Sequence, residues 1–191
     1  MASAMAGMVA GVLMVGVALG ALPEAAADPV SPAARCEDLA GGLQVTPWLQ
    51  PIVADVCRRS PTFRRQVARL AHVDGLAVTV HRLMLPQPAT ALWRAQTLIT
   101  RVGGQVRSAD VQVPSGDARM MAELLAHEFE HILEQLDGVD LKRWVGRSGV
   151  RHVGADREGS PIETERAQQV GRLVAGQYAA AAVEITAFKV R

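Results

Sequence analysis

The sequence lacks a block of like charges. Lysine and arginine total 20, aspartate and glutamate total 19, and the formal net charge is +1. Because proteins that bind nucleic acids concentrate basic residues on one face or along one segment, this even balance excludes a nucleic-acid partner. A length of 191 residues is enough for a single domain with a hydrophobic core of its own.

A long apolar run occurs at the N terminus and is not repeated. Residues 5–22 carry no charge, Pro23 ends the run, and Ala25 to Ala27 are the small residues that a signal peptidase requires. We therefore predict a signal peptide over 1–27 and a mature single domain over 28–191, secreted, periplasmic or on the cell surface. No basic residue precedes the run, so an uncleaved membrane anchor or a start further upstream is the alternative. A membrane is a partner only in that case.

Cysteine is scarce, with Cys36 and Cys57 alone. Closed structural zinc sites commonly use four cysteine-rich protein ligands, and two cysteines do not supply such a set. Export would instead favour a Cys36–Cys57 disulfide. Closing a loop of about 22 residues would stabilise the fold by about 3 kcal/mol through the unfolded state. Two buried free thiols are the alternative.

Capping residues predict where the helices begin. Ser60-Pro61 offers an N-cap and a first-turn proline, Asp117 offers a second N-cap, and Ser160-Pro161 offers a third. Helices are predicted over residues 47–58, 61–70 and 118–137, and from residue 160 onward.

Three β-branched or alternating segments predict strands. They cover residues 76–80, 97–102 and 105–113, and Gly103-Gly104 permits a chain reversal between the last two. Helices, strands and then helices indicate an α+β fold. We expect a small antiparallel sheet packed on the helix over 118–137, with N-terminal helices and a C-terminal helix beside it.

Residues 127–131 read His-Glu-Phe-Glu-His, the pattern H-E-x-x-H. On a helix, side chains four residues apart share a face about 5–6 Å apart, so His127 and His131 can bind one metal ion. Glu128 lies about 100° around the helix from His127, where its carboxylate can reach a water on the metal. Two imidazoles favour zinc (Zn2+) over calcium or magnesium. A pair of surface histidines without a metal is the alternative.

The motif, the strands before it and the segment over 162–167 resemble the zincin metallopeptidases, most closely the gluzincin type. The resemblance covers about residues 76–175. The chain is also similar to small exported bacterial proteins with this helix, whose substrates are undefined. The resemblance implies a zincin-like catalytic domain, one zinc ion per chain and a third ligand from a glutamate on a separate downstream helix. The resemblance also implies, less directly, that the protein hydrolyses peptide bonds.

Helical phase selects Glu163 as that third ligand over Glu165. In a helix that includes Glu163, small or apolar residues follow it at four, seven, eight and eleven positions, so its carboxylate would face inward. A buried carboxylate needs a neutralising partner, and zinc would serve. The competing explanation is a capping box in which Glu163 bonds to the amide of Ser160. Glu165 or a water is a further alternative for the third position.

Two other acidic residues follow the motif. Asp137 stands where metzincins, a related type, have their third ligand, but that type requires glycine where this chain has Glu134. Asp137 would then point about 240° away from His131. Glu134 lies on the histidine face, where it would either hold a ligand by a hydrogen bond or be an exposed charge.

These residues predict a zinc hydrolase whose substrate is a peptide or protein. Glu128 would deprotonate the zinc-bound water that attacks the substrate carbonyl, and His152 or Tyr178 would stabilise the resulting oxyanion. The alternative is a non-catalytic, zinc-binding exported domain with a role in structure or partner binding. Two histidines and one glutamate leave a fourth position open, which favours catalysis.

Overall fold

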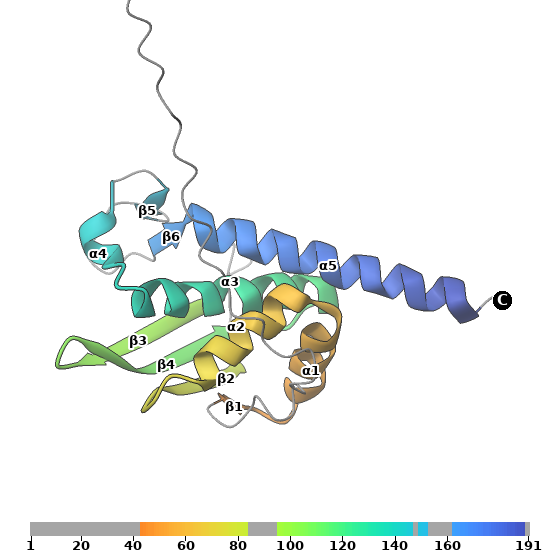
Figure 1. Cartoon of the computed structure of the whole chain (residues 1–191), viewed down its shortest axis with the longest axis horizontal. Coiled ribbons are helices and arrows are strands. Elements are labelled where there is room, and N and C mark those ends of the chain that lie inside the picture. The colour runs from red at the N-terminus through yellow and green to blue at the C-terminus, as the bar shows by residue number, and fades with distance from the viewer. Residues whose placement is uncertain (1–42, 84–94, 147–148, 153–161, 190–191) are drawn as a thin grey trace, which may run out of the picture.

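The computed structural model describes residues 43–83, 95–146, 149–152 and 162–189. Within these ranges it combines helices with a sheet, which confirms the α+β class (Figure 1). The elements, in chain order, are β1 (Leu43–Val45), α1 (Gln50–Arg59), α2 (Pro61–Ala71), β2 (Ala77–Arg82), β3 (Gln96–Val102), β4 (Gln105–Val113), α3 (Ala118–Leu136), α4 (Leu141–Trp144), β5 (Val150–His152), β6 (Ile162–Thr164) and α5 (Glu165–Lys189).

The main sheet has the strand order β1-β2-β4-β3 and is mixed. β2 is parallel to both β1 and β4, and only the β3–β4 pair is antiparallel. The predicted antiparallel sheet is therefore wrong. The alternation of buried and exposed residues along β2 and β4 shows which side chains of each strand face the core. It does not show which strand lies beside it or in which direction that strand runs. The predicted reversal is confirmed, because Gly103 and Gly104 have φ of 60° and 81° and form a two-residue hairpin loop.

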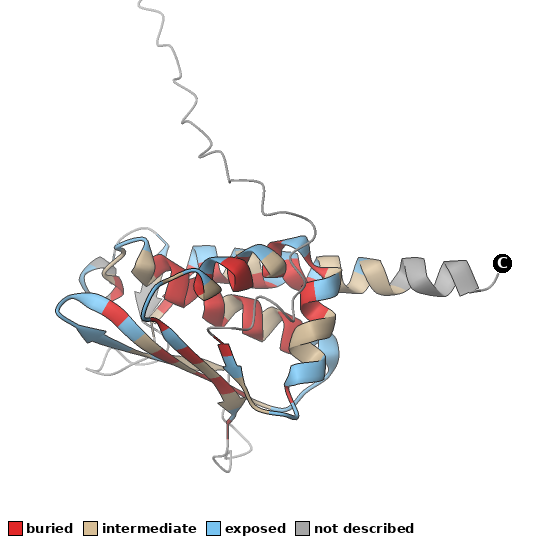
Figure 2. Ribbon diagram, turned by 60° about the horizontal axis from the view of Figure 1, so that its bottom comes forward, coloured by how far each residue is buried: buried red, intermediate tan, exposed pale blue. Residues whose placement is uncertain are grey.

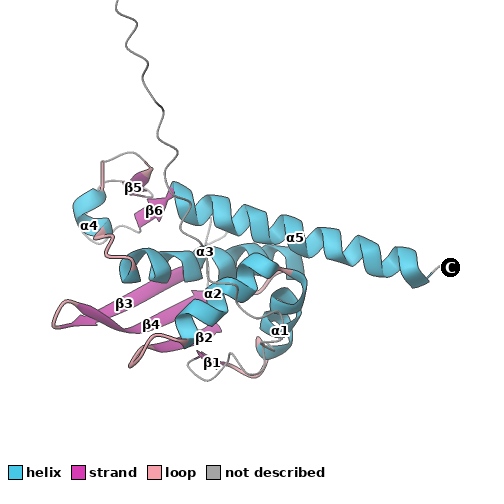
Figure 3. Ribbon diagram, in the orientation of Figure 1, coloured by secondary structure: helices cyan, strands magenta, loops and turns pink. Residues whose placement is uncertain are grey.

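Helix α3 contacts β3 and β4 on one side and α1, α2 and α5 on others. The helices lie together on one side of the main sheet (Figure 3). Asp117 caps α3 as predicted, since its Oδ1 accepts from the amide of Met120 at 2.9 Å. Apolar residues of α3 from Met121 to Leu133 are buried, and Phe129 stacks on Phe63 of α2 with ring centroids 5.3 Å apart. Figure 2 shows buried residues on the helices and on the strands beneath them.

The last helix begins later than predicted. Residues 162–164 form strand β6, which pairs with β5 in a two-stranded sheet, and α5 starts at Glu165. Thr164 caps this helix, because its Oγ1 accepts from the amide of Ala167 at 3.0 Å. The capping box between Ser160 and Glu163 is therefore wrong: Ser160 lies outside the described residues, and the helix start that it would cap is four residues further on.

Helix α5 packs along α3 and its C-terminal part projects beyond the other elements (Figure 1). The predicted inward face is confirmed, with Ala167, Gly171 and Val174 buried. At Gly171 the two helices approach so closely that a Cβ would lie 2.9 Å from the carbonyl oxygen of Glu123 and 3.3 Å from the Cβ of His127. A side chain at this position would push α5 away from the histidines.

The predictions for the N terminus fall largely outside the described residues. These include the signal peptide over 1–27 and Cys36, so its pairing with Cys57 stays a prediction. Cys57 itself is buried in α1. No helix among the described residues has the length and apolarity needed to cross a membrane.

Candidate metal centre

The H-E-x-x-H segment occupies the third and fourth turns of α3, so His127 and His131 lie one above the other. Their Nε2 atoms are 3.1 Å apart, and the rings meet edge to face with centroids 4.7 Å apart. Both rings are largely buried, with 12% and 9% of their side-chain surfaces exposed. The predicted convergence of the two imidazoles is present in the fold.

Glu163 approaches this pair from β6. Its Oε2 lies 3.3 Å from Nε2 of His127 and accepts a hydrogen bond from Gln168 at 3.2 Å. One ligand atom each from His127, His131 and Glu163 falls within 4.8 Å of the others. Burial alone would raise the pKa of Glu163, but the hydrogen bond and charge of His127 outweigh it and lower the pKa to about 2. The carboxylate is therefore held ionised beside the imidazoles.

Glu165 lies elsewhere. Its side chain is exposed and accepts a hydrogen bond from Gln169, while its backbone amide donates to the carbonyl of Gly149. The preference for Glu163 over Glu165 agrees with this placement, although the helical phase used to reach it does not apply to a residue on a strand. What brings Glu163 inward is the pairing of β6 with β5 just before the cap of α5.

Glu128 is the buried acid beside the histidines, with 3% of its surface exposed. Its Oε2 accepts a hydrogen bond of 2.6 Å from Oγ1 of Thr97 on β3. Burial raises the pKa of Glu128, although the charges of His131 and His127 and the Thr97 hydroxyl oppose the shift. A raised pKa brings a carboxylate nearer to the range in which it can accept and return a proton. Sequence reasoning missed Thr97, because nothing in a strand pattern indicates what a hydroxyl will meet across the fold.

Glu134 holds the other histidine. Its Oε2 lies 3.1 Å from Nδ1 of His131, so the ring can donate its Nδ1 proton and leave Nε2 for a metal. The same oxygen accepts a hydrogen bond of 3.1 Å from Oγ1 of Thr164. Of the two roles considered for Glu134, the supporting contact is therefore the one present, since only 3% of the residue is exposed.

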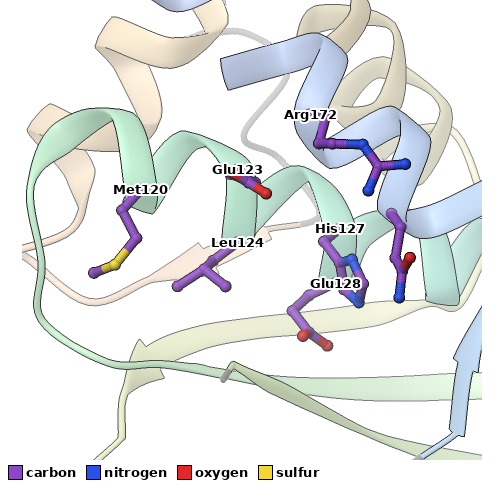
Figure 4. A pocket seen from close by; sticks show the side chains of 7 residues that line it. Met120, Glu123, Leu124, His127, Glu128 and Arg172 are labelled. Carbon is purple, nitrogen blue, oxygen red and sulfur yellow. The ribbon is translucent and has the colours of Figure 1, made fainter. Parts of the chain in front are cut away.

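A cleft of about 360 Å³ opens beside His127. One row of α3 lines it with Met120, Leu124 and Glu128, and Arg172 reaches it from α5 (Figure 4). Glu123 and Gln168 complete the lining. The histidine face of α3 thus forms a wall of this cleft, from which His127 and the buried Glu128 can be reached.

Two other candidate residues, Tyr178 and Asp137, have partners elsewhere, and a third, His152, is not tested. The Tyr178 hydroxyl donates to Asp55 at 2.7 Å, and Arg59 lies over its ring, so the structure contradicts the oxyanion role suggested for this tyrosine. Asp137 is engaged in ion pairs with Arg69 and Arg166. His152 belongs to β5, where its backbone pairs with Ile162; the role suggested for its side chain lies outside the described part of the structure.

The spacing of the three side chains matches part of the tetrahedral geometry of zinc. Ligand atoms about 2.0–2.1 Å from a tetrahedral zinc lie about 3.3–3.4 Å from one another. The separations of 3.1 Å between the two Nε2 atoms and 3.3 Å between His127 and Glu163 fit two edges of such a tetrahedron.

Comparisons of the chain with protein-family models, with curated proteins and with solved structures find no match.

Proposed function

We propose that this protein is a zinc-dependent hydrolase of peptide bonds, in which His127, His131 and Glu163 hold the metal and Glu128 is the general base. The observation that carries the proposal is the convergence of two Nε2 atoms and one carboxylate oxygen at separations of 3.1 and 3.3 Å. Without a metal, these contacts would require one proton on Nε2 of His127 to serve two acceptors. A zinc ion satisfies all three groups together.

The chain's own residues then divide the work. Zinc, when bound, would polarise a substrate carbonyl and make water a stronger nucleophile. Glu128, held by Thr97, would take a proton from the attacking water and return it to the amine that leaves as the C–N bond breaks. Among the three proposed ligands His127 lines the cleft, and Glu128 lines it as well, so a water and then a substrate would reach the centre along this edge.

Arg172 is the candidate for stabilising the negative charge that develops on the carbonyl oxygen. It is the one arginine or lysine among the cleft-lining residues, and no ion pair holds it within the described parts of the chain. A cation beside the reacting carbonyl is suited to this task. Arg172 would have the oxyanion-stabilising role that was predicted for His152 or Tyr178.

The alternative is an exported domain that binds zinc but turns nothing over. Its ligands would be the same, so zinc content does not distinguish the two functions. Glu128 does, because this buried carboxylate lines the cleft beside His127, where a hydrolase needs a general base and a site that only holds zinc does not.

The test compares Glu128→Gln with Glu123→Gln, which changes a less buried carboxylate in the same cleft. Elemental analysis should find about one zinc per chain in the wild type and both variants, and none in His127→Ala. A peptide-library digest should show activity in the wild type and Glu123→Gln but not in Glu128→Gln. Zinc binding without any digestion by the wild type would favour the non-catalytic domain.

A further inference from the structure

Three acidic residues follow one row of α3: Glu130, Glu134 and Asp137, which we call the acidic row. They lie four and three residues apart, so their side chains project from successive turns of one face. Glu130 and Glu134 are 4% and 3% exposed, and buried carboxylates are stable only with partners in place. All three find partners in the start of α5, through Thr164 and Arg166.

Arg166 makes the outer part of this contact. Its Nη2 lies 2.6 Å from Oε1 of Glu130 and 3.1 Å from Oδ2 of Asp137. The second oxygen of Glu130 accepts from Nε2 of Gln66 at 2.7 Å, which adds α2 to the contact. These bonds fix α5 against α3 and touch none of the three proposed ligands.

Thr164 makes the inner part, and its hydroxyl has two partners. The oxygen accepts from the amide of Ala167 at 3.0 Å, which caps α5. Because that amide can only donate, the single hydroxyl proton is left for Oε2 of Glu134, 3.1 Å away. The same Oε2 receives Nδ1 of His131, also at 3.1 Å. One continuous chain of hydrogen bonds thus joins the cap of α5 to a histidine of the metal centre.

Glu163, the third proposed ligand, directly precedes Thr164. The position of Thr164 therefore bears on two ligands at once. Its backbone holds Glu163 toward His127, and its hydroxyl orients the carboxylate that fixes the tautomer and direction of His131. Contacts of this kind behind a ligand commonly change metal affinity about 10–100-fold when they are removed.

We propose that Thr164 and Glu134 are positioning residues that couple the start of α5 to the metal centre, so that zinc binds tightly only when this cap is formed. The proposal rests on the metal site proposed above. It assigns to Thr164, which touches neither metal nor substrate, a control over affinity that Arg166 does not have. Zinc should in return stabilise the β6–α5 junction, because coupling between two equilibria is reciprocal.

The experiment compares Thr164→Val, which removes the hydroxyl, with Thr164→Ser, which keeps it, and with Arg166→Gln, which loosens α5 without touching Glu134. Zinc affinity is measured by competition with a chromophoric chelator, and the melting temperature of the metal-free protein is measured by circular dichroism. We expect zinc binding about 10–100-fold weaker in Thr164→Val, wild-type affinity in Thr164→Ser, and a lower melting temperature with unchanged affinity in Arg166→Gln. The visible spectrum of bound Co2+ should shift in Thr164→Val alone.

If Arg166→Gln and Thr164→Val lose affinity in proportion to their melting temperatures, the contact only docks the helix and the proposal is overturned. Should Thr164→Val fail to fold, Glu134→Gln serves instead, and equal zinc affinity and Co2+ spectra in that variant and the wild type would also overturn it. In the double variant Thr164→Val, Glu134→Gln, the fold-loss of zinc affinity should be smaller than the product of the fold-losses of the two single variants, since both substitutions act through His131. A wild-type protein that binds no zinc would refute the metal site itself, and this result is distinct from the outcomes that overturn only the coupling through Thr164.

Discussion

The two sides of helix α3 are stabilised by different chemistry. The side facing α2 and the sheet buries apolar residues such as Met121, Leu125 and Phe129, whereas the side facing β6 and α5 buries His131 and two residues of the acidic row, Glu130 and Glu134. Apolar contacts are non-directional and accept some repacking. Buried charges need every partner in position. We therefore expect the apolar side to determine the stability of the fold and the polar side to determine metal affinity.

The largest effect should follow from Phe129→Ala on the apolar side. Phe129 is fully buried and stacks on Phe63, so its truncation should lower the free energy of unfolding by about 3–5 kcal/mol. Urea unfolding of the metal-free protein measures the loss. Leu173→Ala, at a residue 50% exposed on α5, is the control and should change stability by about 0.5 kcal/mol or less. A loss below that of Leu173→Ala would contradict the assigned core.

Glu163→Gln tests the polar side. The variant should weaken zinc binding by at least about 100-fold, equivalent to about 2.7 kcal/mol, because an amide replaces an ionised ligand. Glu165→Gln changes an exposed carboxylate two residues away and should keep wild-type affinity. Zinc should accordingly raise the melting temperature of the wild type and of Glu165→Gln, but much less that of Glu163→Gln. The reverse ranking of the two variants would transfer the ligand role to Glu165.

Local signals in the sequence predicted most elements of the fold. Ser60 and Asp117 cap the helices that they were expected to cap, and Gly103-Gly104 forms the expected hairpin loop. The parallel pairing of β2 with β4 was not predictable in this way, because it depends on how a crossover connection runs rather than on residues near either strand. β1, with three residues, is too short to produce a recognisable pattern.

The site was predictable where its residues share one helix. Spacing on one helix is enough to bring His127 and His131 together. Glu163 comes from a second segment, and its place beside the histidines was predicted from a helical phase that does not apply, because Glu163 lies on a strand. A better signal was present, since Thr164 is itself a favourable N-cap followed by an acidic Glu165 in the first turn. Thr97 had no signal of this kind, because only tertiary packing brings it to Glu128.

Gly171→Ala should affect both sides of the comparison at once. The added Cβ would lie 2.9 Å from the backbone oxygen of Glu123, which has no flexible end to move aside, so α5 must shift away from α3. We expect a loss of about 1–3 kcal/mol in stability, with weaker zinc binding as Glu163 moves. Gly176→Ala is the matched control on the same helix, where a Cβ meets nothing within 4 Å. It should stabilise the protein by about 0.5–1 kcal/mol, and chemical unfolding measures both changes.

The smallest effect concerns Thr97, where the sheet contributes a polar contact to the centre. Its hydroxyl donates to Glu128 at 2.6 Å, so Thr97→Val leaves a buried carboxylate with one donor fewer while keeping the shape of the side chain. If that bond orients the base, kcat should fall about tenfold, or about 1.4 kcal/mol in the activation free energy. Zinc content should not change, because no ligand is altered.

Thr100→Val is the control for this prediction, since Thr100 lies on the same strand with its side chain exposed, and it should retain full kcat. Steady-state kinetics on a peptide identified in the library digest separates kcat from KM. Because Thr97 comes from the side of α3 that otherwise supplies apolar packing, a fall in kcat would show that both sides of the helix serve the reaction. An unchanged kcat in Thr97→Val, beside an inactive Glu128→Gln, would restrict the chemistry to the side that faces β6 and α5.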